Sequence, residues 1–170
     1  MVASRSWDVQ VPIPPTRADL EKWRAGLRRA SEANKQAELL REQIIDKHGR
    51  RYIGIARPKG FRRQGIEQAC FYNAARLAID DLRPCTYVEG FAQAASGLWV
   101  HHAWINQDGE HAIDTTWRDA ERCRYLGIPF SKKVVSQVIY RRIKTGRRHS
   151  AYSGLLDPAD FDLLGLVAHG

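Results

Sequence analysis

The sequence predicts an α+β fold in which a helix that carries a cysteine packs on a small antiparallel sheet. The first observation is the apolar spacing of residues 66–81, which is typical of a helix and includes Cys70 near its start. The second is a series of three strand-like segments that follow this helix closely, at 86–92, 98–106 and 111–115. Parallel strands need a crossover of about a dozen residues or more, so this spacing favours antiparallel pairing.

The chain of 170 residues is long enough for one domain with its own core. Prolines at positions 12, 14 and 15 exclude a helix there, so we expect residues 1–16 to form an extended arm. We expect a single domain over 17–170 with three parts: a long helix at 17–48, a core at 52–130 and a C-terminal helical segment at 131–170.

The composition excludes several classes of protein. Apolar residues make up 44% and charged residues 27% of the chain, which is typical of a globular rather than a disordered protein. The sequence contains no stretch of about 18 uncharged apolar residues, which excludes a transmembrane helix. Its first residues lack the apolar centre of a secretory signal. The three cysteines, Cys70, Cys85 and Cys123, are too far apart for a zinc motif or a disulfide framework. We therefore expect a cytoplasmic protein without a metal or other cofactor.

The formal net charge of +8 favours anionic partners. The basic residues are dispersed along the chain, however, and the common nucleic-acid-binding motifs are absent from the sequence. A protein or peptide is therefore the expected partner, and a nucleic acid is the weaker alternative. The helix expected at 17–48 is longer than a small domain is wide, which leaves the oligomeric state open.

Cys70, His102 and Asp114 are the candidate catalytic residues. A thiol near the start of a helix lies where the helix dipole and unpaired N–H groups favour an anion, and the thiolate is the nucleophilic form. An Asp108-Gly109 pair between the last two strand-like segments predicts a hairpin. Counting outward from this turn places His102 opposite Asp114 on one face. The carboxylate would then orient the imidazole, and the imidazole would activate the thiol.

The order of these motifs resembles that of the transglutaminase-like branch of the papain-fold cysteine enzymes. His102-Ala103-Trp104 is similar to the histidine strand of that family, in which an aromatic residue follows the histidine. Asp114-Thr115-Thr116 is similar to its aspartate strand, although proline is common there at the position of Thr115. The segment 87–92 resembles the strand that precedes the histidine, and the whole resemblance covers residues 64–130.

The resemblance implies a role for each member of the set. Cys70 is the nucleophile, His102 the base and Asp114 the orienting carboxylate. His102 is preferred because Ala103 and Trp104 follow it, whereas the hairpin alone leaves His101 as an alternative, since a one-residue slip exchanges neighbours on a strand.

Gln64 and Gly65 resemble the Gln-Gly approach of papain-type enzymes. The resemblance implies that the Gln64 amide and the backbone N–H of Cys70 donate to the developing oxyanion, with Gln68 as the rival side chain. For the tryptophans of this region, packing against the sheet is the alternative to contact with substrate. Three aromatic residues are expected to line the substrate cleft: Trp104, Tyr72 and Trp99.

We expect a cysteine-dependent hydrolase or acyltransferase that acts on an amide or thioester. The acyl group would pass to water in a peptidase or amidase and to an amine in a transglutaminase-like enzyme, and the sequence leaves both open. The alternative is a catalytically silent papain-like scaffold that binds or inhibits a host protein or nucleic acid, as a phage- or mobile-element-encoded protein would.

Overall fold

The computed structural model describes residues 17–61, 66, 68–94 and 96–165, with side chains from residue 31 onward. By its internal contacts the chain divides into two compact units, Met1–Gln36 and Ala37–Gly170. In the first unit the structure describes the beginning of helix α1 (Arg17–His48), which covers the range expected for the long helix. The arm expected at 1–16 lies outside the described residues. All other helices and strands described below belong to the second unit.

Helix α1 ends within the second unit. Its last turns bury Ile44 and Ile45 in the core, and Leu40 packs against the same cluster. The backbone N–H of Gly49 donates to the carbonyl of Ile45 at 2.7 Å and ends the helix. A Cβ at Gly49 would lie 2.3 Å from that carbonyl oxygen, so glycine alone fits there. Within the described part of the chain, no helix is long and apolar enough to cross a membrane.

Five strands form a curled mixed sheet in the order β3-β2-β5-β1-β4. The class is α+β, as predicted. The strands are β1 (Arg50–Gly54), β2 (Thr86–Gln93), β3 (Trp99–Asn106), β4 (His111–Ala112) and β5 (Arg124–Phe130). The expectation of a purely antiparallel sheet is wrong at one edge, because β4 pairs with β1 in parallel. A bridge between Ile105 and Ile113 brings the two ends of the sheet together.

Strand β5 lies in the middle of the sheet, where the sequence predicts no strand. Gly127 and Pro129 interrupt its pattern, and both residue types are unusual inside a central strand. The structure explains the glycine, since a Cβ at Gly127 would lie 2.6 Å from the Trp104 indole and 2.7 Å from the carbonyl oxygen of Glu89. Close packing at this point of the curled sheet therefore requires Gly127, and this glycine is one of the two residues that interrupt the strand pattern in the sequence.

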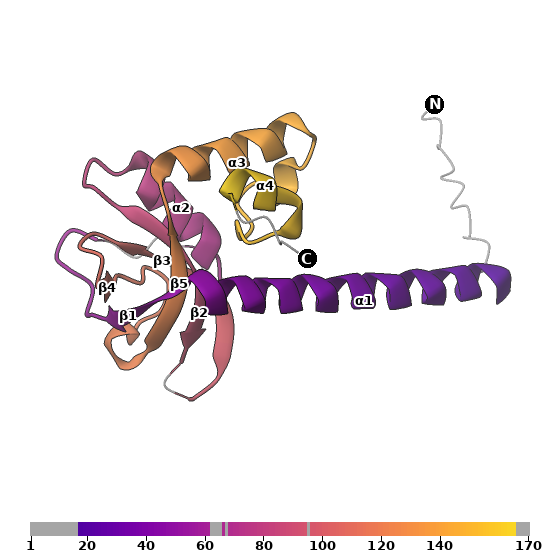
Figure 1. Cartoon of the computed structure of the whole chain (residues 1–170), viewed down its shortest axis with the longest axis horizontal. Helices are drawn as coiled ribbons and strands as arrows, with labels where there is room; N and C mark the ends of the chain where they lie inside the picture. Colours follow the sequence, from indigo (N-terminus) through magenta and orange to yellow (C-terminus); the bar gives the residue numbers. More distant parts are fainter. Residues whose placement is uncertain (1–16, 62–65, 67, 95, 166–170) are drawn as a thin grey trace, which may run out of the picture. The chain divides into compact units, whose positions relative to one another are not determined.

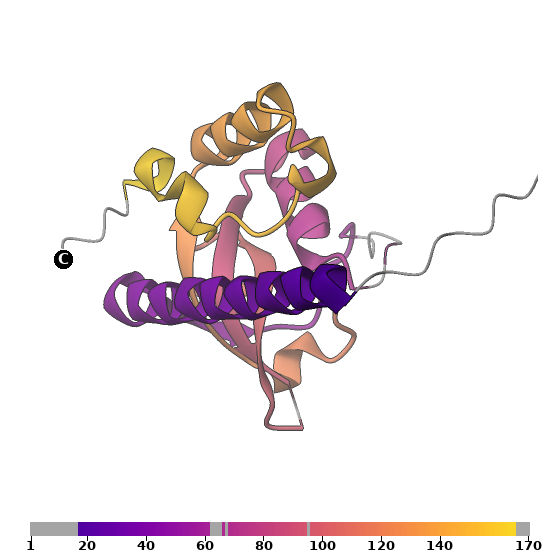
Figure 2. The same cartoon turned by 90° about the vertical axis from the view of Figure 1, so that its right-hand side faces the viewer.

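Helix α2 (Cys70–Asp80) begins four residues later than the apolar pattern predicts, so that Cys70 is its first residue. Helix α3 (Lys132–Lys144) is capped by Ser131, whose side chain accepts a hydrogen bond from the N–H of Val134. Figure 1 shows α2 and α3 together at one end of the sheet, and Figure 2 shows the same end turned by 90°. A short helix, α4 (Phe161–Leu164), follows a single 3₁₀ turn near the C-terminus.

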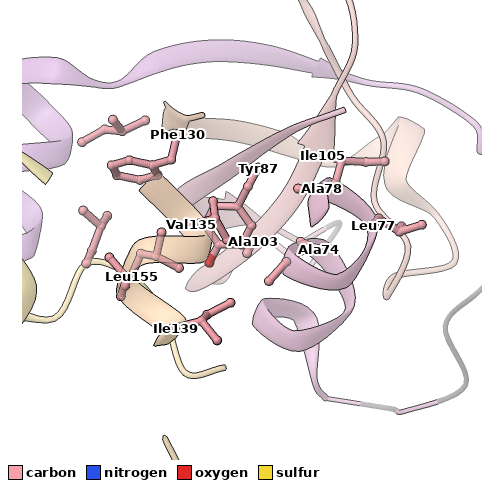
Figure 3. Packing of buried hydrophobic residues seen from close by; sticks show 14 of the residues in the cluster. Ala74, Leu77, Ala78, Tyr87, Ala103, Ile105, Phe130, Val135, Ile139 and Leu155 are labelled. Carbon is pink, nitrogen blue, oxygen red and sulfur yellow. The ribbon is translucent and has the colours of Figure 1, made fainter. Parts of the chain in front are cut away.

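Two hydrophobic clusters lie on opposite faces of the sheet. In the larger cluster, α2 and α3 pack against β2, β3 and β5, and Figure 3 shows Ala74 and Ala78 of α2 facing Tyr87 and Ile105. The small side chains on α2 let the helix approach the strands closely. The smaller cluster lies on the other face and contains mostly aromatic and small residues, namely Tyr52, Val88, Ala92, Trp104, Ala112, Cys123 and Tyr125.

The segment after α3 is held by one fully buried arginine. Arg142 donates through Nε to Asp160 at 2.7 Å and through NH2 to the carbonyl of Gly154 at 2.8 Å. Its NH1 group donates to the carbonyl of Ser153 at 2.8 Å. These bonds satisfy a charge that would otherwise be costly to bury, and they fix the course of the chain towards Leu155.

Candidate functional site

Cys70 occupies the first position of α2, where the backbone N–H groups of a helix have no acceptor within the helix itself. The N-cap residue, Ala69, has no side chain that can accept from these groups. Gln68, just before it, adopts a positive φ of 60°, a conformation that costs a non-glycine residue about 1–3 kcal/mol. Helix α2 therefore has no side-chain cap at its N-terminus, which lies at Cys70. Cys70 itself is 7% exposed.

His102 of β3 contacts both Cys70 and Asp114. Its Nε2–H donates to Oδ2 of Asp114 at 2.7 Å, and its ring also hydrogen-bonds the Cys70 side chain. Because Nε2 is committed to the carboxylate, Nδ1 is the nitrogen left for the sulfur. The structure thus brings the three predicted residues together, and it selects His102 over His101.

The pKa of His102 rises from its usual 6.5 to about 9. Burial of the ring lowers this pKa, but hydrogen bonds to Asp114 and Cys70, together with their negative charges, raise it by more. At neutral pH the imidazole is therefore protonated. A cation beside the Asp114 carboxylate stabilises the anionic form of that carboxylate.

Asp114 is buried, and its carboxylate accepts four hydrogen bonds. Oδ1 accepts from the backbone N–H groups of Thr116 at 2.7 Å and Trp117 at 3.0 Å. Oδ2 accepts from His102 and from the Tyr125 hydroxyl, the latter at 3.1 Å. Burial raises the pKa of Asp114, but these donors, His102 foremost, outweigh it and lower that pKa below its usual value. The carboxylate stays charged and is held at both oxygens.

The register behind the hairpin prediction is wrong, although the predicted contact exists. Ile105 pairs with Ile113, so the position opposite Asp114 is Trp104 rather than His102. The backbone N–H groups of Ile53 and Ile55 donate to the carbonyls of residues 110 and 112, which draws this segment towards β1. Asp114 then reaches His102 from a turn rather than from an extended strand.

Two aromatic residues, Trp117 and Tyr125, complete the surroundings of the pair. The Trp117 indole stacks on the His102 imidazole, with ring centroids 4.3 Å apart and planes 26° apart. The Tyr125 hydroxyl bonds to Asp114, and burial raises the pKa of Tyr125 well above its usual range, so the hydroxyl remains a donor. Both rings exclude water from the bond between His102 and Asp114, which strengthens it.

Asn73 ties the cysteine helix to the turn that carries the carboxylate. It is fully buried and lies one helical turn after Cys70. Its Nδ2 donates to Thr116 Oγ1 and to the carbonyl of Ile66, both at 3.1 Å. Since the Thr116 N–H donates in turn to Asp114, the contacts form a closed ring that runs through the sulfur, the imidazole, the carboxylate and this amide.

A second histidine–carboxylate pair lies next to the first. Glu89 of β2 is fully buried and accepts from Tyr87 Oη at 2.5 Å, from His101 Nε2 at 2.9 Å and from the N–H groups of Leu155 and Leu156. Successive side chains on a strand point to opposite faces, so His101 faces away from His102. Because Glu89 also accepts from Leu155 and Leu156, it fastens the C-terminal segment to the sheet.

The remaining predicted site residues have different positions. Gln64 lies outside the described residues. Trp104 is fully buried, so the expectation that it lines a substrate cleft is wrong; it packs against Tyr52 and Tyr125 because it shares the inner face of the curl with them. Trp99 lies on the opposite face of β3 from His102, so it is not part of this site.

Tyr72 lies near the start of α2 but on a different side of the helix from Cys70. Its ring packs edge-to-face on Tyr152, with centroids 5.0 Å apart, and its hydroxyl accepts from Arg76 at 2.9 Å. A role for Tyr72 in binding substrate stays a prediction. Among the described residues, no group of three or more His, Cys, Asp or Glu side chains is placed to hold a metal ion.

No protein-family model, curated protein or solved structure matches the chain. The chemistry of the site is therefore inferred from its own residues and their geometry.

Proposed function

We propose that the protein is a cysteine-dependent hydrolase or acyltransferase that acts on an amide or thioester of a protein or peptide. One observation carries this proposal: the His102 ring bonds to Cys70 on one side and to the buried Asp114 carboxylate on the other. A nucleophile, a proton carrier and a group that orients the carrier are the three parts that such chemistry needs.

In the proposed reaction, the Cys70 thiolate attacks the carbonyl carbon, a C–S bond forms and an electron pair moves to the oxygen. When the tetrahedral intermediate collapses, the C–N or C–S bond of the substrate breaks. The protonated His102 gives its proton to the leaving amine or thiol. Water or an amine then attacks the thioester, His102 takes its proton, and the sulfur leaves as a thiolate.

The uncapped start of α2 supplies a donor for the oxyanion. The backbone N–H of Cys70 lies at the first helical position, which has no carbonyl within the helix to accept it. We propose the Gln64 amide as the second donor, on the resemblance of Gln64-Gly65 to papain-type enzymes. Loss of one such donor costs about 3 kcal/mol of transition-state stabilisation.

The proposed family is the transglutaminase-like branch of the papain-fold enzymes. Its support is a cysteine at the first residue of a helix, a histidine on a strand and an aspartate after the next strand, in that order in an α+β chain. The proposed activity is inferred from the site residues and not from the fold, because one fold can have many functions.

Alkylation by iodoacetamide tests the proposal. At slightly acid pH, we expect Cys70 to be labelled about tenfold or more faster than Cys85, because burial raises the pKa of the Cys85 thiol. Mass spectrometry of the digested protein measures both rates in one sample. His102→Gln should remove the difference, whereas His101→Gln, the matched control, should preserve it. Equal rates at the two cysteines in the wild-type protein would contradict an activated thiolate.

A catalytically silent binding protein is the second candidate, and the small exposure of Cys70 favours it. Cys70→Ala distinguishes the two functions. Loss of the biological effect in a folded variant supports the chemistry, and retention of the effect supports binding alone.

A further inference from the structure

Two adjoining hollows lie on the face of the sheet that also carries His101, and neither is lined by Cys70, His102 or Asp114. The first, of about 360 Å³, lies between the end of α1 and the strands, and the second, of about 670 Å³, extends over β1 and β5. Trp99 and Leu126 line both hollows, so together they form one continuous surface. We call this surface the Trp99 face.

The middle of the Trp99 face is apolar and open to solvent. Trp99 is 47% exposed and Ile53 is 66% exposed, although aromatic and β-branched residues on a sheet are usually covered. Trp99 pairs with Gln93 of β2, and Gln93 also pairs with Arg124 of β5. Because Arg124 pairs in turn with Ile53 of β1, Trp99 and Ile53 lie in one row on one face of the sheet. Exposed apolar surface with a charged border is typical of an interaction site.

The charges at the two ends of this face have opposite signs. Three acidic side chains from α1 border the first hollow, namely Glu38, Glu42 and Asp46. Arg51 and Arg124 border the second hollow, along with one acid, Glu110. Within the part of the chain that the structure describes, none of these six residues forms an ion pair.

We propose that the Trp99 face binds the same face of a second copy of this chain. A two-fold axis near Trp99 would place the acidic end of each copy on the basic end of the other, so one surface supplies both halves of the complementarity. Trp99 and Ile53 would form the apolar centre of the contact, which is where binding energy concentrates.

The acidic end argues against a nucleic acid as the occupant, because three carboxylates would repel phosphates beside the apolar centre. The charge of the whole chain, +8, also disfavours unspecific self-association. A specific dimer therefore needs the three carboxylates of α1, and reversal of a single charge should disrupt it. It does not depend on any activity at Cys70.

Sedimentation equilibrium of the full chain over a concentration series tests this proposal. We expect the wild-type protein to dimerise, and to do so less strongly at high salt. At each of the two contacts, Glu42→Arg places an arginine against Arg124 of the other copy, and Arg124→Glu places a glutamate against Glu42. Because like charges then face one another, each variant alone should be monomeric. A mixture of the two variants restores opposite charges at both contacts and should form a mixed dimer.

Circular dichroism and thermal unfolding of each variant show that it is folded, and Arg148→Glu, at an exposed position outside both hollows, is the matched control. A monomeric wild-type protein at every concentration overturns the proposal. Dimerisation that survives both reversals overturns the assignment to this face. Failure of the mixture to dimerise overturns the pairing of acidic with basic ends.

Discussion

Two neighbouring histidines on β3 use the same chemistry for different purposes. His102 and His101 each donate a ring nitrogen to a buried carboxylate, Asp114 and Glu89 respectively. Each carboxylate accepts four hydrogen bonds, two of them from backbone N–H groups. Only the His102 ring also hydrogen-bonds a thiol.

The difference lies in what surrounds the second side of each ring. His101 is covered by Phe71 of α2 and by Phe91, with ring centroids 4.8 and 6.1 Å away. Its carboxylate, Glu89, binds the segment that includes Leu155. A histidine–carboxylate pair by itself therefore indicates a buried polar network, and the neighbouring nucleophile is what indicates a reactive site.

The largest expected effect is on the structural pair. Glu89→Gln should lower the free energy of unfolding by about 3–5 kcal/mol, because the amide leaves a buried backbone N–H facing a donor and removes a charge from the network. Urea denaturation measures the loss. Glu121→Gln, an exposed acid, is the control and should change stability by less than about 0.5 kcal/mol. A small effect of Glu89→Gln on the free energy of unfolding would contradict a structural role for the His101–Glu89 pair.

The reactive pair should make stability depend on pH in the alkaline range. The folded pKa of His102, about 9, is above its unfolded value near 6.5, so its contribution is fully present below pH 6.5 and is lost as pH rises through 9. This shift corresponds to at most ~3 kcal/mol. Unfolding by urea at a series of pH values measures it, and His102→Gln should flatten the curve. An unchanged slope in His102→Gln would contradict the shift.

Asp114→Asn should have a smaller effect on stability and a specific effect on reactivity. The amide oxygen can still accept from the turn, so the free energy of unfolding should fall by about 1–3 kcal/mol. The loss of the negative charge should lower the pKa of His102 and slow the alkylation of Cys70 near neutral pH. If alkylation kept its wild-type rate, Asp114 would have no role in activating the thiol.

Asn73→Ala tests the closed ring of contacts that joins Cys70, His102, Asp114 and Asn73, and it has the smallest expected effect on stability. It removes two hydrogen bonds of 3.1 Å and should cost about 1–2 kcal/mol of stability. The rate of Cys70 alkylation should also fall, since the helix start would no longer be tied to the turn. Thr116→Val removes one of the same bonds, so the double variant should lose less than the sum of the two. Additive losses would show that the two side chains act independently.

Local patterns predicted the parts of the fold that depend on local structure. The ranges of α1, β2 and β3 follow from apolar periodicity, and the residue types of the site follow from their order in the chain. Strand β5 could not be predicted in this way, because Gly127 and Pro129 break its pattern for reasons of close packing. The parallel pairing of β4 with β1 depends on residues far apart in sequence, which no local signal encodes.

The residues around the site show the same limit. Tyr125 carries no motif, and it acquires its role only when an unpredicted strand brings it to Asp114. The expectation for Trp104 fails because its ring is fully buried among the aromatic residues of the inner face, which the alternation of β3 alone does not show.

Titration of His102 by NMR, in the wild-type protein and in Cys70→Ala, tests the central claim most directly. We expect the His102 ring to titrate at about 9 in the wild-type protein, and we expect removal of the sulfur to lower this pKa by about one unit or more. A His102 ring that titrates near 6.5, or a pKa that is the same in both proteins, would contradict the coupling of the imidazole to Cys70.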